Sequence, residues 1–209
     1  MALALSHLLS LHLVLLLPYS TIAQTSRNQS PGSSLTTQEK DSYRASPSGD
    51  FASGFQQIAK GGYLLAIWFN KIPEKSTVWS ANGDNLVPTG SKVELTKDGQ
   101  FVLSDPIGKE IWKPELNLLG VPYAAMLDTG NFVLASQDTA HLWQSFDHPT
   151  AMLPTQKKSL GSKLVAQYLE MNYSNGRFQF TLKLDGNLVL QTRAYPMDNN
   201  YVDYWPRPE

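Results

Sequence analysis

A glycine-centred phrase recurs four times along this chain and constrains its fold more than any other feature. In the second and third copies a tryptophan follows at a fixed distance: Trp112 lies 11 positions after Phe101, and Trp143 lies 11 positions after Phe132. Glycine tolerates the positive φ that a tight primed hairpin turn requires. The phrase therefore predicts a repeated β-hairpin unit whose tryptophans take equivalent positions in a shared core. The four copies are Gly49-Asp50-Phe51-Ala52, Gly99-Gln100-Phe101-Val102, Gly130-Asn131-Phe132-Val133 and Gly186-Asn187-Leu188-Val189.

The rest of the chain has the same β character. Helical periodicity is nearly absent, and short runs rich in β-forming residues lie between Gly, Pro, Asn and Asp; examples are residues 63–69, 77–79 and 101–103. Short strands with frequent turn signals indicate an all-β sandwich, barrel or prism.

A longer echo indicates the domain organisation. The run Gly32-Ser33-Ser34-Leu35 returns 129 residues later as Gly161-Ser162-Lys163-Leu164. Each run leads to a further match, Ser48-Gly49-Asp50-Phe51 in the first case and Asn175-Gly176-Arg177-Phe178 in the second. We therefore expect a complete domain of three β units over residues 24–153, followed by an incomplete second copy over residues 154–209.

The first 23 residues read as a secretory signal peptide. They are apolar from Ala2 to Leu17 and close with Thr21-Ile22-Ala23, which fits cleavage before Gln24. The apolar run is short for a membrane anchor, and no later run reaches membrane-span length, so we expect a secreted, extracellular product. Two sequons follow, at Asn28 and Asn172; Pro31 directly after the first makes Asn28 the poorer glycosylation candidate.

Composition excludes several classes of function. The 17 Lys and Arg balance 18 Asp and Glu without a basic stripe, so no nucleic-acid partner is expected. The chain has no cysteine, which excludes a thiolate metal site, a cysteine nucleophile and disulfide support. No nucleophile elbow, phosphate-binding loop or zinc-protease motif is present, and His141, Asp147 and His148 match no ligand spacing. We therefore expect no catalytic residue, metal or cofactor.

Four runs together resemble one known family. They are SYRASPSGDFASGFQ, LLAIWFNKIPEKSTVWSAN, DGQFVLSD and MLDTGNFVLASQDTAHLWQSFDHPT. They are similar to the bulb-type (monocot mannose-binding) lectin domain of plant G-type lectin S-receptor-like serine/threonine kinases. The resemblance implies a β-prism of three four-stranded sheets about a pseudo-threefold axis. It also implies full-length relatives at the plasma membrane with a membrane span and a kinase, so this chain resembles a truncated, non-enzymatic member.

The family's sugar site is written Gln-x-Asp-x-Asn-x-Val-x-Tyr, with polar side chains for mannose hydroxyls and Val for the sugar ring. The first match keeps Asp98 and Val102, has Gln100 in place of Asn, and has Thr96 and Ser104 at the outer positions. The second keeps only Asn131 and Val133, because Asp128 is displaced by one residue and strand alternation should point it elsewhere. The third keeps Asp185, Asn187 and Val189 in the incomplete copy.

These losses leave two classes of function open. A site of directional hydrogen bonds is sensitive to each missing partner, so we expect the phrase to serve mainly as a hairpin with a degraded mannose site. The first reading is an extracellular carbohydrate-binding lectin module with glycans as weak partners. The alternative is a non-sugar module of the same fold that contacts proteins or pairs with other receptor ectodomains.

Overall fold

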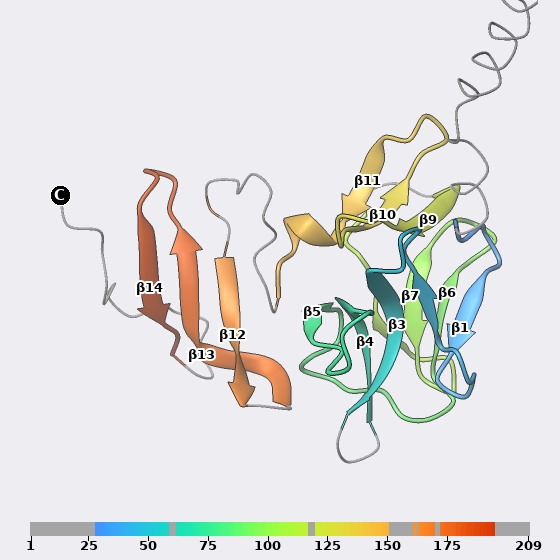
Figure 1. The fold of residues 1–209 in the computed structure, drawn as a ribbon, viewed down its shortest axis with the longest axis horizontal. Helices are drawn as coiled ribbons and strands as arrows, with labels where there is room; N and C mark the ends of the chain where they lie inside the picture. Colours follow the sequence, from blue (N-terminus) through green and yellow to red (C-terminus); the bar gives the residue numbers. More distant parts are fainter. Residues whose placement is uncertain are drawn as a thin grey trace, which may run out of the picture.

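The computed structural model describes residues 28–58, 62–116, 120–150, 161, 163–169 and 172–194. Within these ranges the chain forms fourteen strands in four antiparallel sheets and one short 3-10 helix, Ser145–Asp147 (Figure 1). The expected signal peptide and the expected domain boundary between residues 153 and 154 lie outside the described residues.

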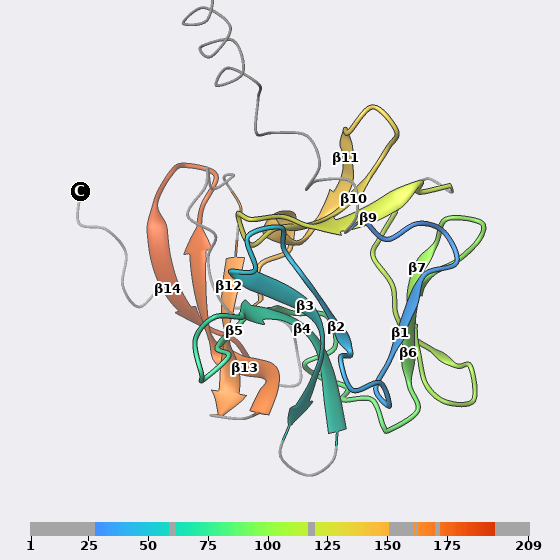
Figure 2. The same cartoon turned by 45° about the vertical axis from the view of Figure 1, so that its right-hand side comes forward.

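The first three sheets form one unit. Sheet I contains, in order, β1 (Ser34–Thr36), β6 (Lys92–Leu95), β7 (Phe101–Ser104) and β8 (Glu110–Trp112). Sheet II contains β11 (His141–Gln144), β10 (Phe132–Ala135) and β9 (Tyr123–Met126). Sheet III contains β2 (Tyr43–Ala45), β3 (Phe51–Ile58), β4 (Gly62–Phe69) and β5 (Thr77–Ser80). In Figure 2, sheet II lies across the top of this unit, sheet I at its right and sheet III at its left.

The three sheets enclose a single hydrophobic core, as the prism prediction requires. Strand alternation places one face of each sheet inward, the buried residues of this core are 0–8% exposed, and partly buried side chains such as Trp112 pack against them. Within the described residues, sheet II has three strands rather than the four expected, and Gln29 adds an isolated antiparallel bridge to Ala124 at its edge. The backbone N–H of each residue donates to the carbonyl of the other, at 2.8 and 2.9 Å.

Three tryptophans meet at the centre of the unit. Trp79, Trp112 and Trp143 come from sheets III, I and II, and their ring centroids are 5.8–6.0 Å apart at 70–73°. Edge-to-face contacts of this kind stabilise beyond the area they bury. The predicted equivalence of Trp112 and Trp143 is confirmed, and Trp79 is its third member.

Backbone register makes the threefold relation explicit. Each tryptophan lies opposite an apolar residue of the preceding strand, and the pairing is irregular directly after that residue in all three sheets. The pairs are Ile67 with Trp79, Leu103 with Trp112 and Leu134 with Trp143. Sequence spacing missed Trp79 because its hairpin is longer.

The glycine phrases form turns, although not of the expected primed type. Gly99 N–H donates to Thr96 O at 2.9 Å, and Thr96 N–H donates to Gln100 O at 2.8 Å. Gly99 has φ 78°, whereas Asp98 is not among the residues with positive φ, which a primed turn would require. The loop is the three-residue type in which glycine takes the left-handed position, and the Gly130 and Gly186 turns repeat its hydrogen bonds. The Gly49 turn, between β2 and β3, lies one strand earlier in its sheet.

Sheet IV contains β12 (Lys163–Leu169), β13 (Asn172–Leu182) and β14 (Leu188–Thr192). Its register repeats that of sheet I, because Leu164, Phe180 and Leu190 pair across it as Leu35, Val93 and Leu103 do in sheet I. The sequence run that returns after 129 residues therefore corresponds to a structural repeat between sheets I and IV. Its extension to Gly49 and Gly176 is wrong, since Gly49 lies in a turn at φ 77°, whereas Gly176 lies inside β13.

Candidate functional site

The first candidate sugar site lies on sheet I, at the β6–β7 turn and along β7. Gln100 Nε2 donates to Asp98 Oδ2 at 3.0 Å, so these two polar residues are brought together. The hydrogen bond from the Thr96 side chain, followed by the backbone N–H of Asp98 itself, lowers the pKa of the Asp98 carboxyl, which is therefore ionised at neutral pH. Val102 is half-buried on the same outward face. The three motif residues therefore share one accessible surface.

Neighbouring charges change that surface. On β6, Glu94 lies opposite Val102 and Lys92 lies opposite Ser104. Lys92 and Glu94 form an ion pair on the partly exposed face. A charged pair thus occupies the strand beside the position where the family motif has tyrosine.

The second candidate site, on sheet II, is internal. Asn131 is 5% exposed and Val133 is 2% exposed. Asn131 Nδ2 donates to Gln144 Oε1 at 2.9 Å, and its Oδ1 accepts from Ser145 Oγ at 3.1 Å and from Phe146 N–H at 3.2 Å. This side-chain amide holds the start of the 3-10 helix in place, and both its Nδ2 and its Oδ1 are already hydrogen-bonded within the protein.

Asp128 points away from the second site, as strand alternation predicts. Its Oδ1 accepts the Ser48 backbone N–H at 2.7 Å, which joins the β9–β10 turn to the β2–β3 turn. This hydrogen bond is the main cause of the lowered pKa of Asp128. The residue therefore serves the junction between sheets II and III.

The third candidate site, on sheet IV, has a hydrogen-bonded polar pair in the turn and a buried valine on the strand that follows. Asp185 Oδ1 accepts the Asn187 backbone N–H at 2.9 Å and its Oδ2 accepts Asn187 Nδ2 at 3.1 Å. The backbone bond is the main reason that the pKa of Asp185 is lowered. Val189 is 1% exposed, and Gln191 is bonded to Gln179 and Thr181. The three candidate sites thus lie on three separate sheets.

Sheet III carries no motif residue at the matching positions. The shared register places Ala66 where sheets I and II have Val102 and Val133. The outward side chains of β4 are apolar and buried, with Leu64, Ala66 and Trp68 no more than 2% exposed. Tyr43 and Tyr173 pack against this cluster, and Tyr43 meets Trp68 edge-on at 5.7 Å. The equivalent of the sugar face is here a packing surface.

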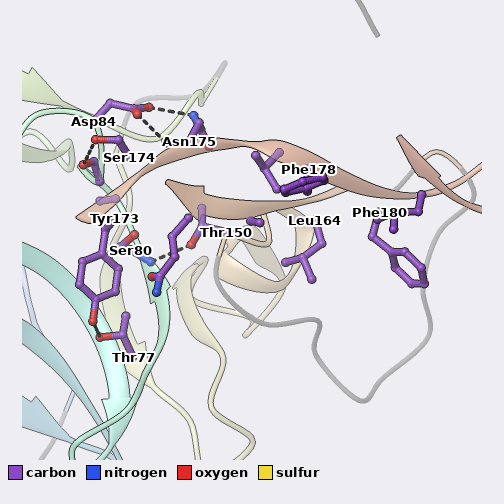
Figure 3. A pocket seen from close by; sticks show the side chains of 16 residues that line it. Thr77, Ser80, Asp84, Thr150, Leu164, Tyr173, Ser174, Asn175, Phe178 and Phe180 are labelled. Carbon is purple, nitrogen blue, oxygen red and sulfur yellow. Dashed lines mark hydrogen bonds between the residues drawn. The ribbon is translucent and has the colours of Figure 1, made fainter. Parts of the chain in front are cut away.

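A cavity of about 560 Å³ separates sheet III from sheet IV (Figure 3). One wall is polar and comes from Thr77, Ser80, Asp84 and Thr150, and the other comes mainly from apolar side chains of sheet IV. Sequence reasoning missed this cavity because the residues of its two walls are far apart in the chain.

Direct hydrogen bonds hold the two sides of the cavity together. Asp84 accepts both the backbone N–H and the side-chain Nδ2 of Asn175, each at 2.8 Å (Figure 3). The hydroxyls of Thr77 and Tyr173 are hydrogen-bonded at 3.3 Å, and Ser174 Oγ donates to Gly83 O at 3.4 Å. Tyr173, Ser174 and Asn175 therefore form the junction between sheet IV and the three-sheet unit.

The described residues contain no group of three or more His, Asp or Glu that could hold a metal ion. None of their helices is long and apolar enough to cross a membrane. Both sequon asparagines, Asn28 and Asn172, are exposed.

Comparisons with known proteins point to one family. Residues 76–169 match the family model of the D-mannose binding lectin. The chain is 46% identical over 214 residues to the G-type lectin S-receptor-like serine/threonine-protein kinase LECRK3 of Oryza sativa subsp. indica, covering 96% of this chain and 26% of the relative. It is 42% identical over 200 residues to the kinase RLK1 of the same type in Arabidopsis thaliana, covering 87% of this chain and 24% of the relative. The chain thus spans about a quarter of the length of these relatives.

Among solved structures, the Japanese Marasmius oreades lectin matches with a TM-score of 0.42 and 17% identity, over 60% of this chain and 95% of that chain. The fold assignment rests instead on the three sheets, their common core and their shared register. Together with the matched family model, these features show that the chain carries a lectin domain of the D-mannose binding family, similar in sequence to part of the G-type lectin S-receptor-like kinases.

Proposed function

We propose that this chain is an extracellular carbohydrate-recognition module of a receptor ectodomain and that its mannose sites are degraded. The observation that carries the proposal is the loss of accessible motif positions. On sheet II, Asn131 and Val133 are buried, and on sheet III the matching residues Leu64 and Ala66 are apolar and buried. Sheet I alone among the three sheets of the prism keeps an exposed Asp beside a half-exposed Val.

The surviving site on sheet I is a weak one. Gln100 is one methylene longer than the Asn of the motif, and Thr96 and Ser104 stand in place of the outer Gln and Tyr. Losing two or three hydrogen bonds of roughly 0.5–1.5 kcal/mol each pushes an already weak monosaccharide affinity below a useful range. Recognition of glycans then depends on multivalent display or on a ligand other than mannose.

A titration of the chain with methyl α-mannoside, followed by NMR, tests this proposal. We expect no saturable shift of the β7 amides. Saturable shifts that Asp98→Ala abolishes would restore the ordinary lectin function at this position. Shifts on sheet II instead would contradict the assignment of the surviving site to sheet I.

The alternative proposal is a protein-contact module, and one observation favours it. The face of sheet III that corresponds to a sugar face packs against Tyr173 of sheet IV. A sheet that has lost its polar residues can thus serve protein contact in this fold. Surface plasmon resonance between this chain and purified ectodomains of the similar kinases would measure such pairing, and competition by mannan would separate it from glycan binding.

We further propose secretion with cleavage before Gln24 and a glycan on Asn172. Asn172 is exposed, and its Oδ1 accepts the Ser174 backbone N–H at 3.2 Å. Asn28, with Pro31 close behind it, is the weaker acceptor. Mass spectrometry of the product from plant cells, before and after glycosidase treatment, checks both points. A retained Met1 or an unshifted mass would refute the respective proposal.

A further inference from the structure

Two Asn-Gly dipeptides occur in the sequence, Asn82-Gly83 and Asn175-Gly176, and the fold brings both of them to the junction between sheets III and IV. The first follows β5, and the second lies within β13. Ser174 Oγ donates to Gly83 O at 3.4 Å, and Asp84 accepts two hydrogen bonds from Asn175 (Figure 3). The two dipeptides therefore lie on opposite sides of the same contact.

Close packing requires the glycine of each dipeptide. A Cβ on Gly83 would lie 2.2 Å from the carbonyl oxygen of Tyr173, and a Cβ on Gly176 would lie 2.7 Å from the carbonyl oxygen of Ala166. Carbon and oxygen atoms that are not bonded to each other do not approach so closely, so any other residue would push the backbones apart. The junction thus depends on glycine at both positions, and in both cases an asparagine precedes it.

An asparagine followed by glycine can lose its side-chain amide without an enzyme, because glycine has no Cβ to shield or restrain its backbone nitrogen. That nitrogen attacks the asparagine Cγ and gives up its proton. The new C–N bond closes a five-membered succinimide, and the Cγ–Nδ2 bond breaks, so that Nδ2 leaves as ammonia. Water then opens the succinimide at either carbonyl, which yields aspartate or isoaspartate.

The two asparagines differ in their surroundings. Asn82 is 5% exposed, its Oδ1 accepts the Leu65 backbone N–H at 2.7 Å, and its Nδ2 donates to two backbone carbonyls at 3.0 and 3.1 Å. Asn175 is exposed, and its Nδ2 donates to the exposed carboxylate of Asp84 at 2.8 Å. Water and base therefore have access to Asn175, whereas the Asn82 amide is enclosed within the three-sheet unit.

We propose that Asn175 is a site of spontaneous deamidation and that its conversion releases sheet IV from the three-sheet unit. In the closed junction, the Asp84 carboxylate binds both the backbone N–H and the Nδ2 of Asn175. The side chain is thus held beside its own N–H and away from the backbone nitrogen of Gly176. Opening of the junction frees the amide for attack, so the rate of conversion follows the fraction of open junction.

The product opposes closure of the junction. An aspartate at position 175 has no side-chain N–H for Asp84, and the two carboxylates repel each other. Isoaspartate also adds one backbone carbon atom within β13, where residue 175 pairs with Gln167 of β12. The conversion therefore turns a transient opening into a lasting one.

The first test measures the conversion in the folded full chain. After incubation at mildly alkaline pH, peptide mapping by mass spectrometry gives the rates at both asparagines, each divided by its rate in the urea-unfolded chain to remove intrinsic differences. Conversion at Asn175 should be several-fold faster than at Asn82. Asp84→Ala should raise the rate at Asn175 several-fold further, whereas Glu115→Ala, which removes an exposed carboxylate outside the junction, should leave it unchanged.

The second test measures the release of sheet IV by limited proteolysis. Release should be several-fold faster from Asn175→Asp and from aged wild type than from fresh wild type. Asn175→Gln should show equal rates before and after ageing, because its six-membered ring closes far more slowly. The amide spectrum of β7 verifies that each variant keeps the three-sheet unit, and fresh and aged wild type give the answer even if a variant misfolds.

Three results would overturn the proposal. Absence of conversion at Asn175, or equal relative rates at Asn82 and Asn175, would show that the junction does not expose this site. A rate that Asp84→Ala leaves unchanged would remove the control by the Asp84 bonds. Converted wild type that releases sheet IV no faster than fresh wild type would show that the modification does not open the junction.

Discussion

The indole of Trp79 meets the indole of Trp143 edge-on, with ring centroids 5.8 Å apart at 72°. Trp79 Nε1 also donates to the carbonyl of His148 at 2.7 Å, and the His148 ring stacks on Trp143 at 5.3 Å. The loop after the 3-10 helix is thus fastened to the centre of the prism. The run from Trp143 to Thr150 therefore takes part in the packing of the core and is not simply a surface loop.

Truncation of the central tryptophans should cost most of the stability of this domain. Trp143→Ala and Trp112→Ala should each lower the free energy of unfolding by about 3–5 kcal/mol, because each removes a large ring from a close-packed core. Trp79→Ala should cost at least as much, since it also leaves the His148 carbonyl without its donor. Chemical denaturation measures the loss, and Tyr168→Ala, an exposed aromatic, is the control. Unchanged midpoints for the three variants would disprove the threefold core.

Asn131 should be a structural residue and not a sugar ligand. Asn131→Ala leaves Gln144, Ser145 and Phe146 without their partner and should destabilise the domain by about 1–3 kcal/mol. Gln100→Ala, which removes one exposed hydrogen bond, should cost less than about 0.5 kcal/mol. Thermal unfolding compares the two. A larger loss for Gln100 than for Asn131 would reverse the roles assigned to sheets I and II.

Asp128 should make the junction between sheets II and III sensitive to pH. Its pKa is lowered in the folded state, chiefly by the Ser48 N–H, so it binds a proton less readily folded than unfolded. Its contribution to stability is therefore complete above the ordinary value of 3.8 and disappears as the pH falls through the lowered folded pKa. The stability difference between wild type and Asp128→Asn should shrink from about pH 6 to about pH 2. The difference for the uncharged neighbour Thr129→Ala should stay constant, and a constant difference for both would contradict the role of the Ser48 bond.

The attachment of sheet IV should depend on close approach at Gly83. A Cβ on Gly83 would lie 2.2 Å from the Tyr173 carbonyl oxygen, so Gly83→Ala requires the two backbones to separate. Asp84→Ala removes both bonds to Asn175. Limited proteolysis should separate sheet IV from the three-sheet unit several-fold faster in either variant than in the control Glu115→Ala. If the digestion rates are equal, the junction seen in Figure 3 does not hold the two parts together.

Local sequence signals predicted the fold well where the physics is local. Turns that require glycine and the fixed spacing of Trp112 and Trp143 predicted three β units. The strand register confirms these units. The spacing did not identify Trp79, because the hairpin before it is longer. Trp79 nevertheless pairs with Ile67 in the same way as the other two tryptophans pair with their partners. The turn type was wrong because Asp-Gly fits two loop lengths, and only the pairing of Thr96 with Gln100 decides between them.

The candidate sites depended on contacts that the sequence does not state. The sequence pattern placed Asn131 and Gln100 at matching strand positions. It could not predict that Ser145 and Phe146 donate hydrogen bonds to the Asn131 side chain. The cavity beside β5 brings Asp84 and Asn175 together across 91 residues of chain. Such long-range contacts follow from the packing of whole sheets, and no local pattern encodes them.

Restoring the family motif on sheet I should create a mannose site where the native chain has a weak one. The variant Thr96→Gln, Gln100→Asn and Ser104→Tyr keeps Asp98 and Val102, which already share an outward face with the altered residues. It loses the Gln100 N–H bond to Thr96 Oγ1, at a cost of about 1 kcal/mol in stability.

Regaining two or three hydrogen bonds to sugar hydroxyls should raise mannose affinity at least about tenfold, since about 1.4 kcal/mol corresponds to that factor. The matched control makes the same repair on sheet II, with Leu127→Gln, Thr129→Asp and Ala135→Tyr. It should gain nothing, because Val133 is buried and the Asn131 amide is bonded to Gln144. Isothermal titration of both folded variants with methyl α-mannoside decides the matter. A gain on sheet II without one on sheet I would show that burial does not limit these sites, and the degraded-site proposal would then fail.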